Sequence, residues 1–264
     1  MRGFACILAA SIGLAATAAP AAAPRRVVSL NLCTDELVLM LADPGQIASV
    51  THLARSPAES TLWRQARRHR GNDGSLLSVA GLRPDLVLTM GGGARDRTGI
   101  AGRLGIHILD LPYPQSIGDI EASVRTVAGA VGRPKRGHAL LAGIDALKRG
   151  RPPGMTDTIW LGGGGRSMSP NGLGAQWLGL AGLKQRALPG DMLTLEQLLV
   201  RPPALLVRSN YRAGQYSGEQ RWLRHPLAAR PRGTRTIATD GRPWTCMGPT
   251  MVAEIARLRA EAGK

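Results

Sequence analysis

Two cysteines and a histidine are the residues of this sequence whose types could support chemistry. Cys33 directly precedes a predicted helix N-terminus, where the helix dipole would favour the thiolate. A packed, inert thiol is the alternative. A nucleophilic site would need His52 as its base and Asp35 to orient that base. Because the segment Cys33-Thr34-Asp35 matches no hydrolase signature, we expect no catalytic activity.

The pairing state of the cysteines is a separate question. Cys33 and Cys246 are the cysteines that follow the apolar N-terminal segment, and in an oxidising compartment they could form one disulfide. One bridge is too few for a disulfide-stabilised scaffold. The two side chains could instead give two soft ligands to one metal ion. The sequence leaves open whether they are free, bonded or metal-bound.

Short apolar runs alternate with helical segments in the first half of the chain. This alternation predicts a parallel sheet that helices cover. Thr34 can cap a first helix that starts at Thr34 or Asp35 and runs to Ala42. Two further helices are predicted over residues 76–82 and 99–104. The predicted strands are residues 27–30, 47–50, 86–89 and 106–109.

The same alternation returns after two helices and a proline-rich linker at 149–154. Ser116 and Asp119 form a capping box at the start of the first of these helices. The turns at 82–88 and 200–206 have similar sequences, which indicates two similar lobes. The middle helices are predicted over 117–131 and 135–148, the later strands over 158–161, 204–207 and 234–238, and the later helices over 171–180, 195–200 and 249–261.

The N-terminus predicts export. Residues 1–23 have a positive start, an apolar run and then small residues, in the order of a secretory signal peptide. The apolar run of roughly 13 residues is shorter than the ~20 that a membrane-spanning helix needs. We therefore expect a periplasmic protein that is released from its signal peptide and has no stable membrane insertion.

The strongly basic composition does not predict nucleic-acid binding. The chain has 34 Lys and Arg against 18 Asp and Glu, a formal net charge of +16. The arginines are scattered, and no aromatic residues alternate with them as in surfaces that stack bases. In an exported protein this charge suits an anionic small ligand better.

Five segments, in order and spacing, resemble the cobalamin and ferric-siderophore class of ABC-transporter substrate-binding proteins. The likeness extends over about residues 25–260. The segments are RVVSLNLCTDEL (26–37), LRPDLVL (82–88), GRLGI (102–106), SIGDI (116–120) and LEQLLVRP (195–202).

This resemblance implies an α/β fold of two lobes with parallel central sheets, joined by a single stiff α-helix, here 134–148. It divides the chain into an N-terminal lobe (24–115), a helical connector (116–153) and a C-terminal lobe (154–264). It implies a monomer without a cofactor that holds a metal chelate between its lobes. The implied partner is the permease dimer of an ABC transporter.

The candidate ligand site consists of the loops after the strands, because parallel α/β sheets bind ligands beyond the carboxyl ends of their strands. Arginines there would neutralise carboxylate or catecholate charge, and aromatic side chains would stack on a flat ligand. A solvated basic rim and core packing are the alternatives. A Cys33–Cys246 disulfide would hold the cleft shut. The candidates are Cys33, Thr34, His52, Gly92, Arg95 and Tyr113 in the first lobe and Arg166, Arg208, Tyr211, Arg212, Asp240, Arg242 and Trp244 in the second.

The resemblance also implies one glutamate on each lobe that docks on permease arginines. Glu196 occupies the second-lobe position, but Leu77 or Ser78 occupies the first-lobe position. Docking would then be asymmetric, or would use Glu59 or another acid. One alternative function is a periplasmic scavenger of haem or another metal chelate with no role in transport. A less favoured one is the hydrolase built on Cys33.

Overall fold

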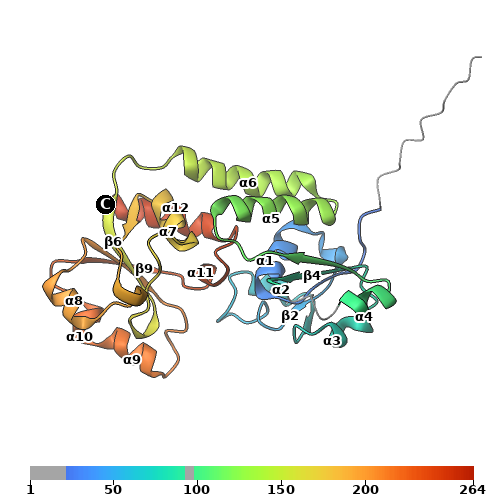
Figure 1. Cartoon of the computed structure of the whole chain (residues 1–264), viewed down its shortest axis with the longest axis horizontal. Helices are drawn as coiled ribbons and strands as arrows, with labels where there is room; N and C mark the ends of the chain where they lie inside the picture. Colours follow the sequence, from blue (N-terminus) through green and yellow to red (C-terminus); the bar gives the residue numbers. More distant parts are fainter. Residues whose placement is uncertain (1–21, 93–97) are drawn as a thin grey trace, which may run out of the picture.

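The chain forms two α/β lobes that a pair of helices connects (Figure 1). The computed structural model describes residues 22–92 and 98–264; residues 1–21, most of the expected signal peptide, lie outside this range. Each lobe contains one parallel sheet, with strand orders β3-β2-β1-β4-β5 and β7-β6-β8-β9. The predicted fold class is therefore confirmed. Along the described stretches, no helix combines the length and the apolar character needed to cross a bilayer.

The first lobe has a buried aliphatic sheet with helices on both faces. Val27, Val28 and Val87 are fully buried, as expected when helices cover both faces of a parallel sheet. Its strands are β1 (Val27–Ser29), β2 (Ile47–Thr51), β3 (Arg70–Asn72), β4 (Leu86–Met90) and β5 (His107–Leu111). Its helices are α1 (Leu32–Leu41), η1 (Pro44–Gln46), α2 (Trp63–Ala66), α3 (Leu76–Ala80) and α4 (Thr98–Arg103).

Helix α1 starts at Leu32, two or three residues earlier than the sequence predicts. Asn31 is its N-cap, and the Asn31 side chain accepts a hydrogen bond of 2.8 Å from the backbone N–H of Cys33. The predicted cap, Thr34, is buried inside the helix, and its hydroxyl lies 2.7 Å from that of Ser29. The prediction was wrong because it overlooked Asn31, which is a better N-cap than Thr34.

The second lobe repeats the arrangement on a smaller sheet. Trp177 is its largest fully buried side chain and donates from Nε1 to the Met247 carbonyl at 2.9 Å. Its strands are β6 (Thr156–Leu161), β7 (Leu183–Gln185), β8 (Leu205–Ser209) and β9 (Arg235–Thr239). Its helices are η2 (Gly163–Gly165), α7 (Leu173–Leu180), η3 (Pro189–Asp191), α8 (Leu195–Val200), α9 (Gly218–Arg224), α10 (Pro226–Ala229), α11 (Pro243–Cys246) and α12 (Met251–Ala262).

Helices α5 (Ile117–Ala130) and α6 (Pro134–Arg149) form an antiparallel pair that crosses both lobes (Figure 1). Ile117 and Ile120 of α5 pack in the second-lobe core, while Val124 and Val127 of the same helix pack in the first-lobe core. The pair approaches closely at Gly137, where an added Cβ would lie 2.7 Å from the Ala128 methyl. Because both cores share the pair, the lobes are held by a stiff helical element rather than a flexible strand.

Candidate functional site

Two adjoining cavities open between and beside the strand-end loops. The cavity between the lobes has a volume of about 450 Å³ and is bounded by β4, the 113–115 loop, α7 and α11. The second-lobe cavity, of about 480 Å³, follows the ends of β6 and β8. Met168 and Met247 line both, so the two form one hollow that we call the interlobe cleft. This is the edge of both sheets at which the sequence predicts a ligand.

Aromatic side chains line the second-lobe part of the cleft. The rings of Trp160 and Trp244 lie 5.6 Å apart between centroids and are tilted by 48°. Trp244 is in the short helix α11, is 5% exposed and donates from Nε1 to Thr239 Oγ1 at 2.8 Å. It therefore serves the core and the cleft wall together, and Tyr211 lines the same cavity.

The four predicted cleft arginines that the structure describes have partners inside the protein. Arg166 pairs with Glu219 at 2.9 Å, and Arg212 pairs with Glu59 of the opposite lobe at 2.6 Å. Arg208 lines neither cavity and donates to the Leu223 carbonyl at 2.8 Å. These arginines thus already form ion pairs or hydrogen bonds within the protein before any ligand binds.

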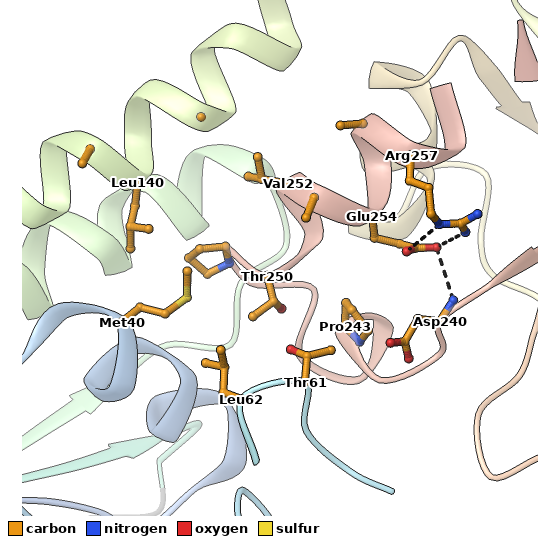
Figure 2. A pocket seen from close by; sticks show the side chains of 15 residues that line it. Met40, Thr61, Leu62, Leu140, Asp240, Pro243, Thr250, Val252, Glu254 and Arg257 are labelled. Carbon is orange, nitrogen blue, oxygen red and sulfur yellow. Dashed lines mark hydrogen bonds and ion pairs between the residues drawn. The ribbon is translucent and has the colours of Figure 1, made fainter. Parts of the chain in front are cut away.

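Asp240 and Arg242 lie away from the cleft cavities. They form a paired carboxylate and guanidinium, with Arg242 Nη2 2.6 Å from Asp240 Oδ2. Arg242 also donates to the Pro57 carbonyl of the first lobe at 3.0 Å, so it joins the lobes. Asp240 faces a separate hollow of about 640 Å³ between α1, α6 and α12, whose apolar wall includes Met40 and Leu140 (Figure 2).

The first lobe gives fewer of its predicted residues to the cleft. Cys33 and Tyr113 line the interlobe cavity. His52 is exposed and its Nδ1 lies 3.2 Å from the Asn72 carbonyl, outside both cavities. Thr34 is buried within the lobe, as described above. Gly92 is half-buried just after β4 and lines neither cavity, and Arg95 lies outside the described residues.

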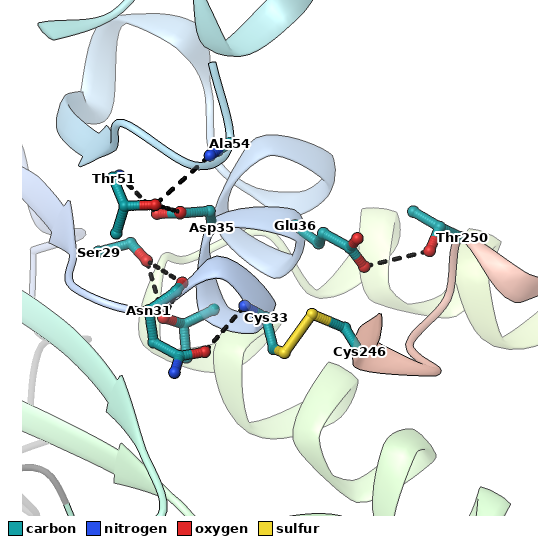
Figure 3. Close-up of a disulfide and its surroundings, with 10 residues drawn as sticks. Ser29, Asn31, Cys33, Asp35, Glu36, Thr51, Ala54, Cys246 and Thr250 are labelled. Atoms are coloured by element: carbon teal, nitrogen blue, oxygen red, sulfur yellow. Dashed lines mark hydrogen bonds between the residues drawn. A yellow bond between two sulfur atoms is a disulfide. The ribbon is translucent and has the colours of Figure 1, made fainter. Parts of the chain in front are cut away.

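Cys33 and Cys246 form a disulfide between the lobes (Figure 3). Their Cα atoms are 5.2 Å apart, and the bridge joins the first turn of α1 to the end of α11. The sulfurs are bonded to each other, so neither is a free nucleophile or metal ligand here. Among the described residues, no three His, Cys, Asp or Glu side chains cluster as a metal site would require.

The disulfide does not fill the cleft. The 450 Å³ cavity remains on one side of it, and a small hollow toward Ile120 and Ser123 of α5 lies on the other. The bridge therefore lies at the floor of the cleft, near the helical connector. We expect from the sequence that a disulfide would hold the cleft shut, whereas the structure has the disulfide and a cavity of about 450 Å³ beside it.

Two buried acids of α1 stand next to the disulfide. Burial raises the pKa of Asp35 to about 7, although hydrogen bonds from Thr51 oppose the shift. Burial likewise raises the pKa of Glu36 to about 8. Glu36 accepts a hydrogen bond of 3.1 Å from the Thr250 hydroxyl of the second lobe (Figure 3). Neither carboxyl lines the cleft cavities, and Glu36 connects the two lobes through Thr250.

The residues considered for permease docking occupy matching positions. Glu196 is the second residue of α8 and is exposed, and Leu77 is the second residue of α3 with 80% of its surface exposed. Glu59, the other candidate, is 9% exposed and bound to Tyr211 and Arg212. It is therefore engaged inside the protein rather than presented on the surface.

Sequence reasoning missed several residues of the cleft. Met168 and Met247 follow glycine- or proline-rich strand-end loops, so the position of those loops could have pointed to them. Gln115, Gln215 and Gln220 add neutral polar groups to the walls. The sequence does not indicate that these glutamines line the cleft, because the residues around them there come from distant parts of the chain.

Comparison with known proteins agrees with this architecture. Residues 27–150 match the family model described as periplasmic binding protein. No curated protein sequence gives a significant match. Among solved structures, the periplasmic vitamin B12 binding protein BtuF of Vibrio cholerae is 14% identical with a TM-score of 0.62, and the alignment covers 90% of this chain and 96% of that one.

Two further structures are similar over the same extent. The periplasmic heme-binding protein RhuT from Roseiflexus sp. RS-1, in apo form, is 22% identical with a TM-score of 0.65, covering 89% of this chain and 97% of that one. The siderophore binding protein BauB, bound to two acinetobactin molecules and ferric iron, is 12% identical with a TM-score of 0.66, covering 91% and 94%. Residues 27–150 are thus similar to the periplasmic binding protein family, and the whole chain shares its fold with these three binding proteins.

Proposed function

We propose that this protein captures a metal-chelate ligand, of the ferric-siderophore or cobalamin type, in its interlobe cleft and delivers it to the permease of an ABC transporter. The observation that carries the proposal is the cleft itself, which lies at the carboxyl ends of both sheets and is lined by Trp160, Tyr211, Trp244 and Tyr113. Flat aromatic faces beside neutral polar groups suit a large planar chelate.

The location we propose is the periplasm, after removal of residues 1–23. The signal-peptide pattern supports it, and so does the disulfide, because such bonds persist in oxidising compartments and are rare in the cytosol. Mass spectrometry of the protein from a periplasmic extract would test both points at once. A mature N-terminus near Pro24 is expected, and a chain that retains residues 1–21 would contradict export with cleavage.

Ligand capture is tested by isothermal titration calorimetry with cyanocobalamin, haem and a ferric siderophore. At least one is expected to bind with one site per chain. Trp244→Phe should weaken that binding by about fivefold, since one aromatic contact is worth roughly 1 kcal/mol. Trp63→Phe is the matched control, because Trp63 lies against Arg64 and Arg67 outside the cleft. Binding of none of the three chelates would contradict the proposal.

Delivery is tested separately by uptake in reconstituted vesicles that contain the cognate permease. Glu196→Ala should abolish uptake while leaving ligand binding intact, because Glu196 is exposed and lines neither cleft cavity. Asp145→Ala, on the exposed face of α6, is the control for removing one surface carboxylate. Full uptake by the Glu196 variant would favour the alternative of a scavenger that binds a chelate without a transporter.

A further inference from the structure

One ion pair joins the two lobes beside the cleft. Glu59, from the loop after β2, accepts hydrogen bonds from Arg212 Nη2 at 2.6 Å, Arg212 Nε at 3.1 Å and the Tyr211 hydroxyl at 2.5 Å. The Glu59 side chain is only 11% exposed, whereas that of Arg212 is 43% exposed. A carboxylate so far removed from water depends on these three donors.

Both partners of Glu59 are cleft residues. Tyr211 and Arg212 line the second-lobe cavity, and Arg212 is held there with a left-handed backbone at φ 53°. Burial, and after it the Glu59 carboxylate, raises the pKa of Tyr211, so its hydroxyl stays protonated as a donor. Glu59 does not line the cavity itself, but its negative charge offsets the positive charge of Arg212 on the cavity wall.

Each described positive charge on the cleft wall has a negative partner. Among the described lining residues, the charged side chains are Arg166, Arg212 and Glu219. Glu219 forms an ion pair with Arg166. Glu59, which does not line the cavity, forms an ion pair with Arg212. The other polar groups are hydroxyls and amides, among them those of Gln115 and Gln215. In the described part of the wall, each guanidinium is therefore paired with a carboxylate, and the remaining polar groups suit hydrogen bonds to neutral groups.

We propose that Glu59 sets the charge selectivity of the cleft, so that it accepts metal chelates without net negative charge and disfavours anionic ones. This inference rests on the proposed function, since it names the ligand class of the same site. An anionic chelate that recruited Arg212 would leave Glu59 buried with Tyr211 alone, and that loss offsets the new attraction. A neutral chelate that bears amides can bind without breaking the ion pair between Arg212 and Glu59.

The test compares an uncharged and an anionic chelate in wild type and Glu59→Gln. The probes are cyanocobalamin and a ferric tris-catecholate, each titrated at low and high salt. Wild type should bind the uncharged probe more tightly, with little salt dependence. Glu59→Gln frees the Arg212 charge and keeps a partner for Tyr211, so affinity for the anionic probe should rise about tenfold at low salt. Tighter wild-type binding of the anionic probe, or an unchanged ratio in the variant, would overturn the inference.

A double variant and a dye pair complete the test. Glu59→Gln with Arg212→Gln should cancel the gain for the anionic probe, and circular dichroism checks that both variants fold. Anilinonaphthalene sulfonate and uncharged phenylnaphthylamine share one ring system, so their affinity ratio reports wall charge without any chelate. If no chelate binds, the proposed function fails, yet a Glu59→Gln shift toward the sulfonate dye still supports the charge role. An unshifted dye ratio refutes it.

Discussion

Removal of the interlobe disulfide is expected to be strongly destabilising. The bond joins residues 213 positions apart, so it closes almost the whole folded chain into one loop. Cross-linking a loop of that length removes denatured-state entropy worth roughly 5 kcal/mol at 25 °C in the chain-entropy model. This is a large part of the ~5–15 kcal/mol that stabilises a typical protein. Cys33→Ser with Cys246→Ser should therefore lower the midpoint of thermal unfolding by roughly 10–20 °C.

The assay is guanidinium unfolding of the mature chain, followed by tryptophan fluorescence and far-UV circular dichroism. The double variant should unfold at lower denaturant and with a steeper slope, because its denatured state is less compact. Reductant should reproduce the effect in wild type and do nothing to the variant. A loss of unfolding free energy below about 1 kcal/mol, or an unchanged slope, would refute the reasoning. Loop closure in the denatured chain would then contribute little to stability.

Two further predictions concern single side chains. Burial raises the pKa of Asp35 to about 7, so the contribution of Asp35 to the unfolding free energy should be fully present below about pH 4 and be lost as the pH rises through 7. Asp35→Asn should make the loss of unfolding free energy between pH 4 and 7 smaller in pH-dependent denaturation, and an unchanged loss over that range would exclude a contribution from Asp35. Gly91→Ala should cost about 2 kcal/mol or more, because φ is 76° and the new Cβ would lie 1.9 Å from the Tyr113 ring. Gly45→Ala, with open space around it, is the control, and equal unfolding midpoints would contradict the clash.

The fold was predictable where local pattern and burial agree. Alternating apolar runs and helical segments located β1, β4, β6 and β8, and the helix from Pro134 was predicted to within one residue of its end. The short edge strands β3 and β7 were missed. With three residues each, they present too little periodicity to separate a strand from a loop.

The site was predictable only in part, because its key contacts join distant segments. The rule for parallel sheets pointed to Tyr113, Arg166 and Tyr211, which line the cleft cavities. It could not predict that Arg242 donates a hydrogen bond to the first lobe instead. Nor could it predict that Glu59, 153 residues before Arg212, accepts hydrogen bonds from the Arg212 guanidinium. Pairing of this kind is decided by the relative placement of the lobes, which no local pattern encodes.

The shared helix pair has a consequence for dividing the molecule. The natural cut, in the linker after α6, would separate Ile144 and Leu147 from the second-lobe core in which they are buried. Ile117 and Ile120 of α5 would be lost from that core as well. Each fragment would expose a broad apolar face, so neither half should remain soluble when expressed alone. Expressed together, the two fragments are expected to reassemble, with α5 and α6 acting as an interface between chains.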